Sequence, residues 1–324
     1  MKLSILDQVP LLNHSSSKQA IQETLELAEL ADRLGYYRYW VAEHHDMPGL
    51  ACPAPDMILS IIGSKTEKIR IGSGAVLLPH YRAFPVAERY NLLATMYPNR
   101  IDLGIGRAPG ASAEAAIALS GNFLENVRDM PNLLDELLAF LNQSFLNNHM
   151  YSKVAPTPVP TTPSIPWLLG TSVKSAKLAA EKGMAYAFGH FMTDKDGPAI
   201  LQSFKQQSSA DTIVAVSVIC AETNERAQEL AQAALLWKMQ QNNGEENAFV
   251  PTENEAKSHN YTNNELDWIR KQKQKMIIGD PCDVRVELHN LAVTYQTNEL
   301  MIITITPDYQ SRKASYELIA EAVL

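Results

Sequence analysis

Cysteine is scarce in this chain, with only three among 324 residues. Cys52, Cys220 and Cys282 lie far apart, and no Cys-x-x-Cys pair occurs. A structural zinc site needs several closely spaced ligands, so this spacing argues against a bound metal. A sparse and odd-numbered set of cysteines is typical of reduced thiols in a cytoplasmic protein.

Long apolar runs and basic clusters are missing as well. No stretch of about 18 uninterrupted apolar residues occurs, so we expect no membrane span. Residues 1–7 lack the features of a signal peptide, which also favours a cytoplasmic protein. The formal net charge is -8 and no Lys/Arg cluster stands out, so nucleic acid is not a predicted partner.

What the chain does contain is a regular alternation of strands and helices. Short apolar segments predict eight strands, at residues 3–6, 38–42, 69–76, 101–105, 167–169, 185–188, 212–220 and 299–305. The intervening amphipathic stretches predict helices, the first of them capped by Ser15–Ser17 and ended by Gly35. Eight strand–helix pairs are the number in a closed (β/α)8, or TIM, barrel. We therefore predict one α/β domain over residues 1–324.

A doubly wound dinucleotide-binding sheet is the main alternative fold. That fold places G-x-G-x-x-G in the first strand-to-helix turn. Residues 7–12 of this chain read DQVPLL and contain no glycine, so the barrel is favoured.

Two segments interrupt the alternation. Five prolines between residues 156 and 166 predict an extended connection inside the domain, with an interdomain linker as the alternative. The polar residues 242–275 predict an insertion with a short helix near 264–270. Insertions of this length are usually functional or poorly ordered.

Two adjacent histidines follow the second predicted strand, in the run Glu43-His44-His45-Asp46. Barrel active sites form at the C-terminal ends of the strands. Neighbouring side chains point in opposite directions, so one histidine can face the pocket while a carboxylate holds the other. A catalytic role, a structural pair and a metal site all remain open from these residues alone.

Small residues and an arginine follow the third and fourth strands. Gly74 and Ala75 leave room for a flat ligand against the backbone, although a strand kink explains them equally well. The loop 104–110 looks like a phosphate loop but has the spacing of neither standard phosphate motif. Its Arg107 can grip a phosphate or form an ordinary salt bridge.

The fifth strand leads into a helix start with three hydroxyl groups. Thr171, Ser172 and Ser175 lie where free N–H groups and the helix dipole favour an anion. Simple N-capping by Thr171 or Ser172 is the alternative. We expect these features to lie on one rim, where they would suit a flat, phosphorylated cofactor. They are the arginine, this helix start and the glycine–alanine pair.

These segments resemble the bacterial luciferase-like, flavin-dependent monooxygenases. The motifs are residues 38–45 (RYWVAEHH), 71–79 (IGSGAVLLP) and 98–110 (PNRIDLGIGRAPG), with further similarity at 167–172, 183–188 and 312–318. The resemblance implies a (β/α)8 barrel, of the single-chain luciferase-like oxidoreductase subgroup, that binds FMN. The segment 242–275 lies near that family's mobile active-site loop.

The resemblance also implies roles for single residues. His44 matches the family's catalytic histidine, and Gly74–Ala75 matches a non-proline cis peptide held against the flavin ring. Arg107, Ser172 and Ser175 match phosphate-binding positions, and Arg128 is a weaker match to a second phosphate arginine. The cofactor-binding residues predicted in all are Gly74, Ala75, Arg107, Arg128, Thr171, Ser172 and Ser175.

The implied reaction uses reduced FMN, delivered by a partner flavin reductase, and O2. A flavin peroxide then oxidises a small organic substrate, which the sequence does not name. His44 is expected to accept or donate protons because its ordinary pKa lies near working pH. Residues 242–275 are expected to close over the site and shield it. Pairing through helices, common in the family, implies a homodimer.

Two other functions stay open. One is hydride transfer with the deazaflavin F420, as in sister families, and the other is flavin binding without turnover. Luciferase carries a reactive cysteine where this chain has Gly106. Chemistry that depends on that thiolate, including light emission from a long-chain aldehyde, is therefore not expected to carry over.

Overall fold

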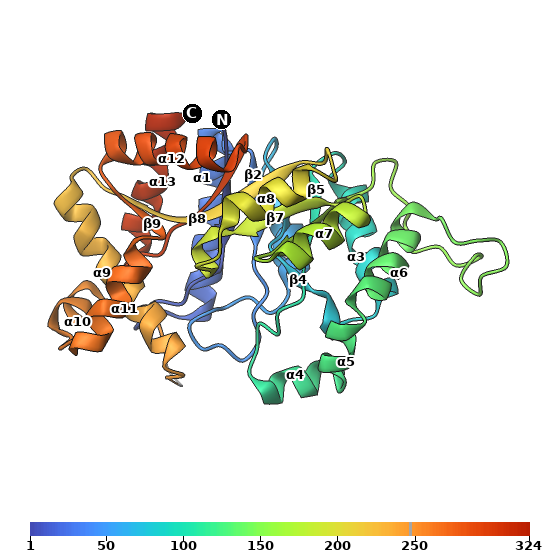
Figure 1. Ribbon diagram of the computed structural model, residues 1–324, viewed down its shortest axis with the longest axis horizontal. Coiled ribbons are helices and arrows are strands. Elements are labelled where there is room, and N and C mark those ends of the chain that lie inside the picture. Colours follow the sequence, from blue (N-terminus) through green and yellow to red (C-terminus); the bar gives the residue numbers. More distant parts are fainter. Residues whose placement is uncertain (246–247) are drawn as a thin grey trace.

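The computed structural model describes residues 1–245 and 248–324. Within them, eight parallel strands form a closed barrel surrounded by helices (Figure 1). In barrel order the strands are β1 (Lys2–Asp7), β2 (Arg38–Val41), β3 (Arg70–Ser73), β5 (Ile101–Gly106), β6 (Ile165–Gly170), β7 (Ala185–Gly189), β8 (Thr212–Cys220) and β10 (Glu299–Ile303). Pairing of β10 with both β8 and β1 closes the sheet. The predicted (β/α)8 barrel is confirmed.

Two short strands lie outside this ring of eight. The single strand predicted over 69–76 is divided into β3 and β4 (Val76–Leu77), with a cis peptide bond between Gly74 and Ala75 at the break. Strand β9 (Met276–Gly279) was not predicted, and it pairs with the C-terminal part of β8.

Helices cover the outside of the barrel. After successive strands come α1 (Ser17–Leu34), α2 (Pro55–Lys65), α3 (Ala83–Met96), α7 (Val173–Glu181), α8 (Gly197–Lys205), α9 (Asn224–Asn242), α12 (Pro281–Tyr295) and α13 (Tyr309–Val323). Helix α1 begins and ends as predicted, because Ser16 accepts a hydrogen bond from the Gln19 amide and Gly35 adopts a φ of 87°. Two single turns, η1 (Leu78–His80) and η2 (His190–Met192), follow β4 and β7.

The long connection after β5 holds three helices, α4 (Ala113–Ser120), α5 (Phe123–Arg128) and α6 (Met130–Asn142). Helices α4 and α5 lie at the lower edge of Figure 1, opposite the two chain ends. Strand β1 starts near the marked N-terminus, so this lower edge is the side to which the strands' C-terminal ends point. We call it the mouth of the barrel.

The predicted insertion, residues 242–275, contains two helices among its described residues. They are α10 (Glu253–Ser258) and α11 (Asn263–Lys273), and both pack against α9. Residues 246 and 247 of this segment lie outside the described residues. Val250 bridges to Leu12, and the Trp237 indole donates a 2.7 Å hydrogen bond to the Ala248 carbonyl. The segment is thereby joined to the loop that follows β1.

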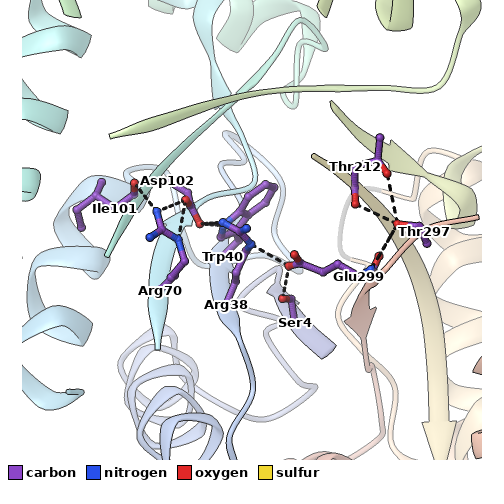
Figure 2. Close-up of polar contacts among 9 residues, drawn as sticks. All are labelled: Ser4, Arg38, Trp40, Arg70, Ile101, Asp102, Thr212, Thr297 and Glu299. Atoms are coloured by element: carbon purple, nitrogen blue, oxygen red, sulfur yellow. Dashed lines mark hydrogen bonds and ion pairs between the residues drawn. The ribbon is translucent and has the colours of Figure 1, made fainter. Parts of the chain in front are cut away.

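A buried ionic network fills the barrel at the opposite end from the mouth (Figure 2). Arg38 bonds Asp102 and Glu299, each at 2.8 Å, and Arg70 bonds the second oxygen of Asp102 at 2.6 Å. Trp40 donates its indole N–H to Asp102 and packs edge-on against Trp167, with ring centroids 5.5 Å apart. The interior is thus a packed core, and this end of the barrel is closed.

No helix within residues 1–245 or 248–324 combines the length and apolar character needed to cross a bilayer.

Candidate functional site

The predicted site residues follow four neighbouring strands. His44 comes after β2, Ala75 after β3, Arg107 directly after β5 and Ser172 after β6. These strands pair in that order and run parallel, so the loops after them meet on one rim of the mouth. Arg128 stands apart at the last position of α5, where it is exposed and bonds none of the described residues.

Glu43 holds one histidine of the adjacent pair. Its buried carboxylate accepts hydrogen bonds from His45 Nε2 at 2.9 Å and from the Tyr81 hydroxyl at 2.8 Å. The amide of Leu77 donates a third at 3.3 Å. Glu43 therefore ties the loop after β2 to the segment around β4, and the structural interpretation of the pair applies to His45.

His44 is in a different environment from its neighbour. Its Nδ1 atom is buried and has no hydrogen-bond partner among the described residues. Burial, aided by the nearby His45, lowers the pKa of His44 to about 4. The expectation for His44 rested on the ordinary pKa of histidine, and burial moves the pKa of this residue away from it. At pH 7 the imidazole is neutral and can accept a proton.

The peptide between Gly74 and Ala75 is cis, the geometry that the family resemblance implied. A Cβ added to Gly74 would lie 2.5 Å from Leu6 Cδ1, so a larger residue here would require the Leu6 side chain to shift. A Cβ added to Gly106 would lie 3.2 Å from Ala75 Cβ. Gly106 therefore packs closely against Ala75, and both residues are buried.

The start of α7 is organised as a capping box. Ser172 Oγ accepts from the Ser175 amide, and Ser175 Oγ accepts from the Ser172 amide, both at 3.2 Å. The N-capping alternative thus accounts for these two serines. The amides of Val173 and Lys174 have no acceptor within the helix and remain at its positive end. Thr171 is half-buried beside Gly189 of β7.

Arg107 follows β5, the strand that pairs with β6 before this helix start. Its side chain is exposed and forms no ion pair within the described part of the chain, so the salt-bridge alternative is not realised there. Burial raises the pKa of Tyr186, and the positive charge of Arg107 partly lowers it again. Tyr186 in turn lies 3.0 Å from Ser175 Oγ. Arg107 and the start of α7 can therefore act on the same anion.

Sequence reasoning missed two partners of these residues. Glu43 was in the quoted run but was not recognised as the group that holds His45. Tyr186 sits in the middle of a buried strand, where a tyrosine is unremarkable until its hydroxyl is seen to contact Ser175. The Tyr186–Ser175 contact joins a strand to a helix and has no linear signal, whereas Glu43 and His45 are two residues apart in one loop and their contact was foreseeable as a carboxylate holding one histidine.

Metal and thiol chemistry find no support in the described residues. No group of three or more His, Cys, Asp or Glu in them is arranged to hold a metal ion. Burial raises the pKa of Cys52 and of Cys220 to about 12, so both thiols stay protonated. The rim instead offers Arg107 and the start of α7 as candidates for binding an anion, and a neutral His44 that can accept a hydrogen bond.

Sequence comparison matches most of the chain to one family. The family described as "luciferase-like monooxygenase" matches residues 1–295. YceB of Bacillus subtilis is 37% identical over 329 residues, which span 99% of both proteins. The N-acetyl-S-alkylcysteine monooxygenase of the same organism is 33% identical over 333 residues, or 100% of this chain and 98% of that protein.

Solved structures agree with this match. Apo-MsnO8 has a TM-score of 0.90 at 32% identity, covering 99% of this chain and 98% of its own. Two more distant structures share the fold at a TM-score of 0.73, each covering 100% of this chain and 99% of its own. They are the oxygenating constituent of 3,6-diketocamphane monooxygenase from Pseudomonas putida in complex with FMN (17% identity) and an F420-dependent secondary alcohol dehydrogenase (14% identity). Proteins of this fold thus bind FMN or F420.

Proposed function

This chain belongs to the luciferase-like monooxygenase family, and we propose that it is an FMN-dependent monooxygenase that oxidises a small organic molecule with O2. The observation that carries the proposal is that an unpaired arginine, a helix start and a cis peptide follow neighbouring strands at the mouth, where they can form an anion site and a surface for a ring. Arg107 and the start of α7 make up the anion site, and the Gly74–Ala75 peptide makes up the surface. A flat ring with a phosphate tail, such as FMN, is the ligand that fits both.

Three features of these residues fit FMN. Arg107, which has no ionic partner in the described chain, can donate two hydrogen bonds to a phosphate. The amides of Val173 and Lys174 add donors at the positive end of α7. The cis peptide at Gly74–Ala75 is the geometry that the family resemblance associates with the flavin ring. When bound, reduced FMN supplies the electrons that activate O2.

His44 is the proposed proton acceptor of the site. A neutral imidazole with an unpaired, buried Nδ1 can take a proton or a hydrogen bond from a bound molecule without first losing another partner. The hydrogen bonds that Glu43 accepts from His45 and Tyr81 keep the loop that carries His44 in place. Residues 248–250, joined to the loop after β1, are suited to excluding water from the mouth.

The proposed assembly includes two protein partners. A separate flavin reductase supplies reduced FMN, as the family resemblance implies. A second copy of the chain covers the apolar outer face of α2 and α3, where four large side chains are exposed: Met57 (69%), Ile61 (41%), Leu92 (49%) and Met96 (49%). The two helices pack against each other, so these side chains belong to one surface.

The test is oxygen consumption by the purified protein with chemically reduced FMN and a panel of candidate substrates. N-acetyl-S-methylcysteine is a first compound, since a relative is named for N-acetyl-S-alkylcysteine. We expect substrate-dependent product with reduced FMN, and none with NADH and FMN until a flavin reductase is added. Failure to bind FMN in either redox state would contradict the proposal.

The same assay separates the two remaining functions. One structural neighbour is F420-dependent, so reduced F420 is tested in parallel under anaerobic conditions. Hydride transfer from F420 to a carbonyl compound, without O2, would establish that alternative. Tight FMN binding with no substrate oxidation across thioethers, ketones, aldehydes and sulfonates would point to a non-catalytic flavin-binding protein.

A further inference from the structure

A cavity of about 110 Å³ opens on the other half of the barrel mouth. Its walls come from the segment after β1, from β8 and β10, and from α9, none of which carries a residue of the anion site. The lining includes Gln8, Ser217, Ile219, Lys238, Ile303 and Ile305. A single water molecule needs roughly 10–15 Å³ of such a cavity. A cavity of about 110 Å³ therefore has room for a small organic group.

The cavity adjoins the proposed flavin surface through β1. This strand pairs with β10 on one side and with β2 on the other. Leu6 of β1 lies directly against Gly74, and Gln8, two residues later, lines the cavity. The cavity and the Gly74–Ala75 peptide therefore adjoin the same strand, two residues apart along β1.

Lys238 is the cationic group of the cavity wall. Its ammonium donates one hydrogen bond, at 3.1 Å, to the Phe191 carbonyl, and no carboxylate of the described residues lies within ion-pair distance. The charge of Asp194 raises the pKa of Lys238, but the Asp194 carboxylate forms its ion pair with Lys275 and not with Lys238. A half-buried ammonium without a counter-ion is stabilised by any anion that reaches it.

The rest of the lining divides into polar and apolar parts. Ser217 and the amides of Gln8 and Gln241 can donate hydrogen bonds, while Ile219 and Ile303 offer an apolar wall. One positive charge with neutral donors suits a single carboxylate group, and the apolar wall suits a short hydrocarbon chain attached to it.

We propose that this cavity binds the carboxylate end of an organic-acid substrate, with Lys238 as the residue that determines specificity for the acid. The proposal rests on the proposed function, because it names the substrate class of the same site. Carboxylate binding to Lys238 holds the acid by one end, and the remainder of the molecule extends toward the rim that carries His44.

The affinity for an acid should depend on pH in one direction. Burial and then Lys275 lower the pKa of Lys238 to about 8, while Asp194 partly opposes them. His190 on the neighbouring η2 is half-buried, and burial keeps its pKa low, so it adds little positive charge at pH 7. Only the protonated lysine attracts a carboxylate, so binding weakens as pH rises through about 8.

The experiment is calorimetric titration of the purified chain, without flavin, with butyrate and with its uncharged isostere butyramide. We expect butyrate to bind at least ten-fold more tightly than butyramide at pH 7 and to lose this advantage by pH 9. Lys238→Met should remove the preference, and Lys238→Arg should retain it at both pH values. Lys18→Met, an exposed lysine on α1, is the matched control and should behave as the wild type.

Equal binding of butyrate and butyramide, or no binding of butyrate, would overturn the proposal. An unchanged preference in Lys238→Met would do so as well. FMN titrations of the same variants separate this outcome from failure of the proposed function. If Lys238→Met weakens FMN binding ten-fold or more, the lysine serves the cofactor and not the substrate. If FMN binds and neutral compounds alone are oxidised, the proposed function stands without this inference.

Discussion

At the scale of single residues, the chemistry depends on how burial changes each side chain. His44 and His45 are adjacent, yet Glu43 holds one of them and leaves the Nδ1 of the other unpaired. Arg107 remains exposed and without an ionic partner in the described chain, whereas Arg38 is buried between two carboxylates. One arginine therefore belongs to the candidate site at the mouth, while the other forms ion pairs inside the closed end of the barrel.

Replacing His44 by Asn should lower substrate oxidation by about 10²- to 10⁴-fold, the usual contribution of a general base. The FMN dissociation constant should change by less than about three-fold, because the phosphate contacts proposed for Arg107 and α7 are untouched. Oxygen uptake and flavin fluorescence titration measure the two quantities. Turnover equal to that of the wild type would rule out the proposed role of His44.

The pH dependence of turnover should reflect a neutral imidazole. Because burial lowers the pKa of His44 to about 4, its basic form is present throughout pH 6–8 and is lost only as pH falls through about 4. If the wild-type profile has an inflection near pH 6.5, we expect the His44→Asn profile to have it too, because His44 does not titrate there. A profile of kcat against pH for both proteins checks this, and an inflection that disappears in His44→Asn would show that His44 titrates at its ordinary pKa.

Arg107→Met should weaken FMN binding by about 10- to 100-fold, since a hydrogen bond to a charged group contributes about 1.5–3 kcal/mol. Riboflavin, which lacks the phosphate, should bind wild type and variant alike. Arg285→Met, on the outer helix α12, is the control and should change neither affinity. Arg128→Met should weaken FMN binding less than Arg107→Met does. An equal loss for riboflavin would contradict phosphate recognition by Arg107.

At the scale of elements, the two ends of the barrel strands have separate tasks. The starts of β1, β2, β3, β5 and β10 contribute the ionic network of Figure 2, and the ends of β2, β3, β5 and β6 lead to the proposed cofactor site. Substitutions at the closed end should therefore change the stability of the fold more than the chemistry.

Arg38→Met should lower the free energy of unfolding by about 3–5 kcal/mol, because it leaves Asp102 and Glu299 buried without their shared cation. Lys65→Met breaks the exposed pair with Glu29 and should cost less than about 1 kcal/mol. Urea denaturation followed by circular dichroism compares the two. Similar losses in both variants would show that the buried network contributes no more than a surface pair.

Several elements could be predicted because their signals are local. Ser16 and Gly35 mark the ends of α1 in the sequence as they do in the structure. The division into β3 and β4 was not predicted as two strands, although a kink at Gly74–Ala75 was one of the two explanations for these small residues. Helix α10 was missed as well, although Thr252 and Glu255 form a capping box that the sequence contains.

At the scale of the whole molecule, the barrel could be predicted from the number of strand–helix pairs. The site could be predicted only as a set of positions, since the rule that barrel chemistry follows the strand ends names loops and not contacts. The charge state of His44 and the free ammonium of Lys238 depend on side chains from distant strands and helices. Such contacts are set by the closed barrel and leave no linear pattern.

The exposed apolar face of α2 and α3 should hold two copies of the chain together. Ile61→Glu, at an exposed position of α2, places a charge in the proposed interface and should shift the protein from dimer to monomer without unfolding it. Light scattering coupled to gel filtration measures the mass. Ile117→Glu, on the exposed face of α4, is the matched control. A monomeric wild type at micromolar concentration would exclude the homodimer.

Closure of the sheet by β10 has a consequence for synthesis of the protein. Both neighbours of β10 in the barrel, β1 and β8, leave the ribosome before it does. Until Glu299 emerges, one edge of β1 stays unpaired and Arg38 lacks one of its two carboxylates. Such sequence-distant pairing makes folding slow, and it exposes nascent strand edges to aggregation. We therefore expect the complete barrel to form only after translation of β10, with chaperones protecting the open sheet until then.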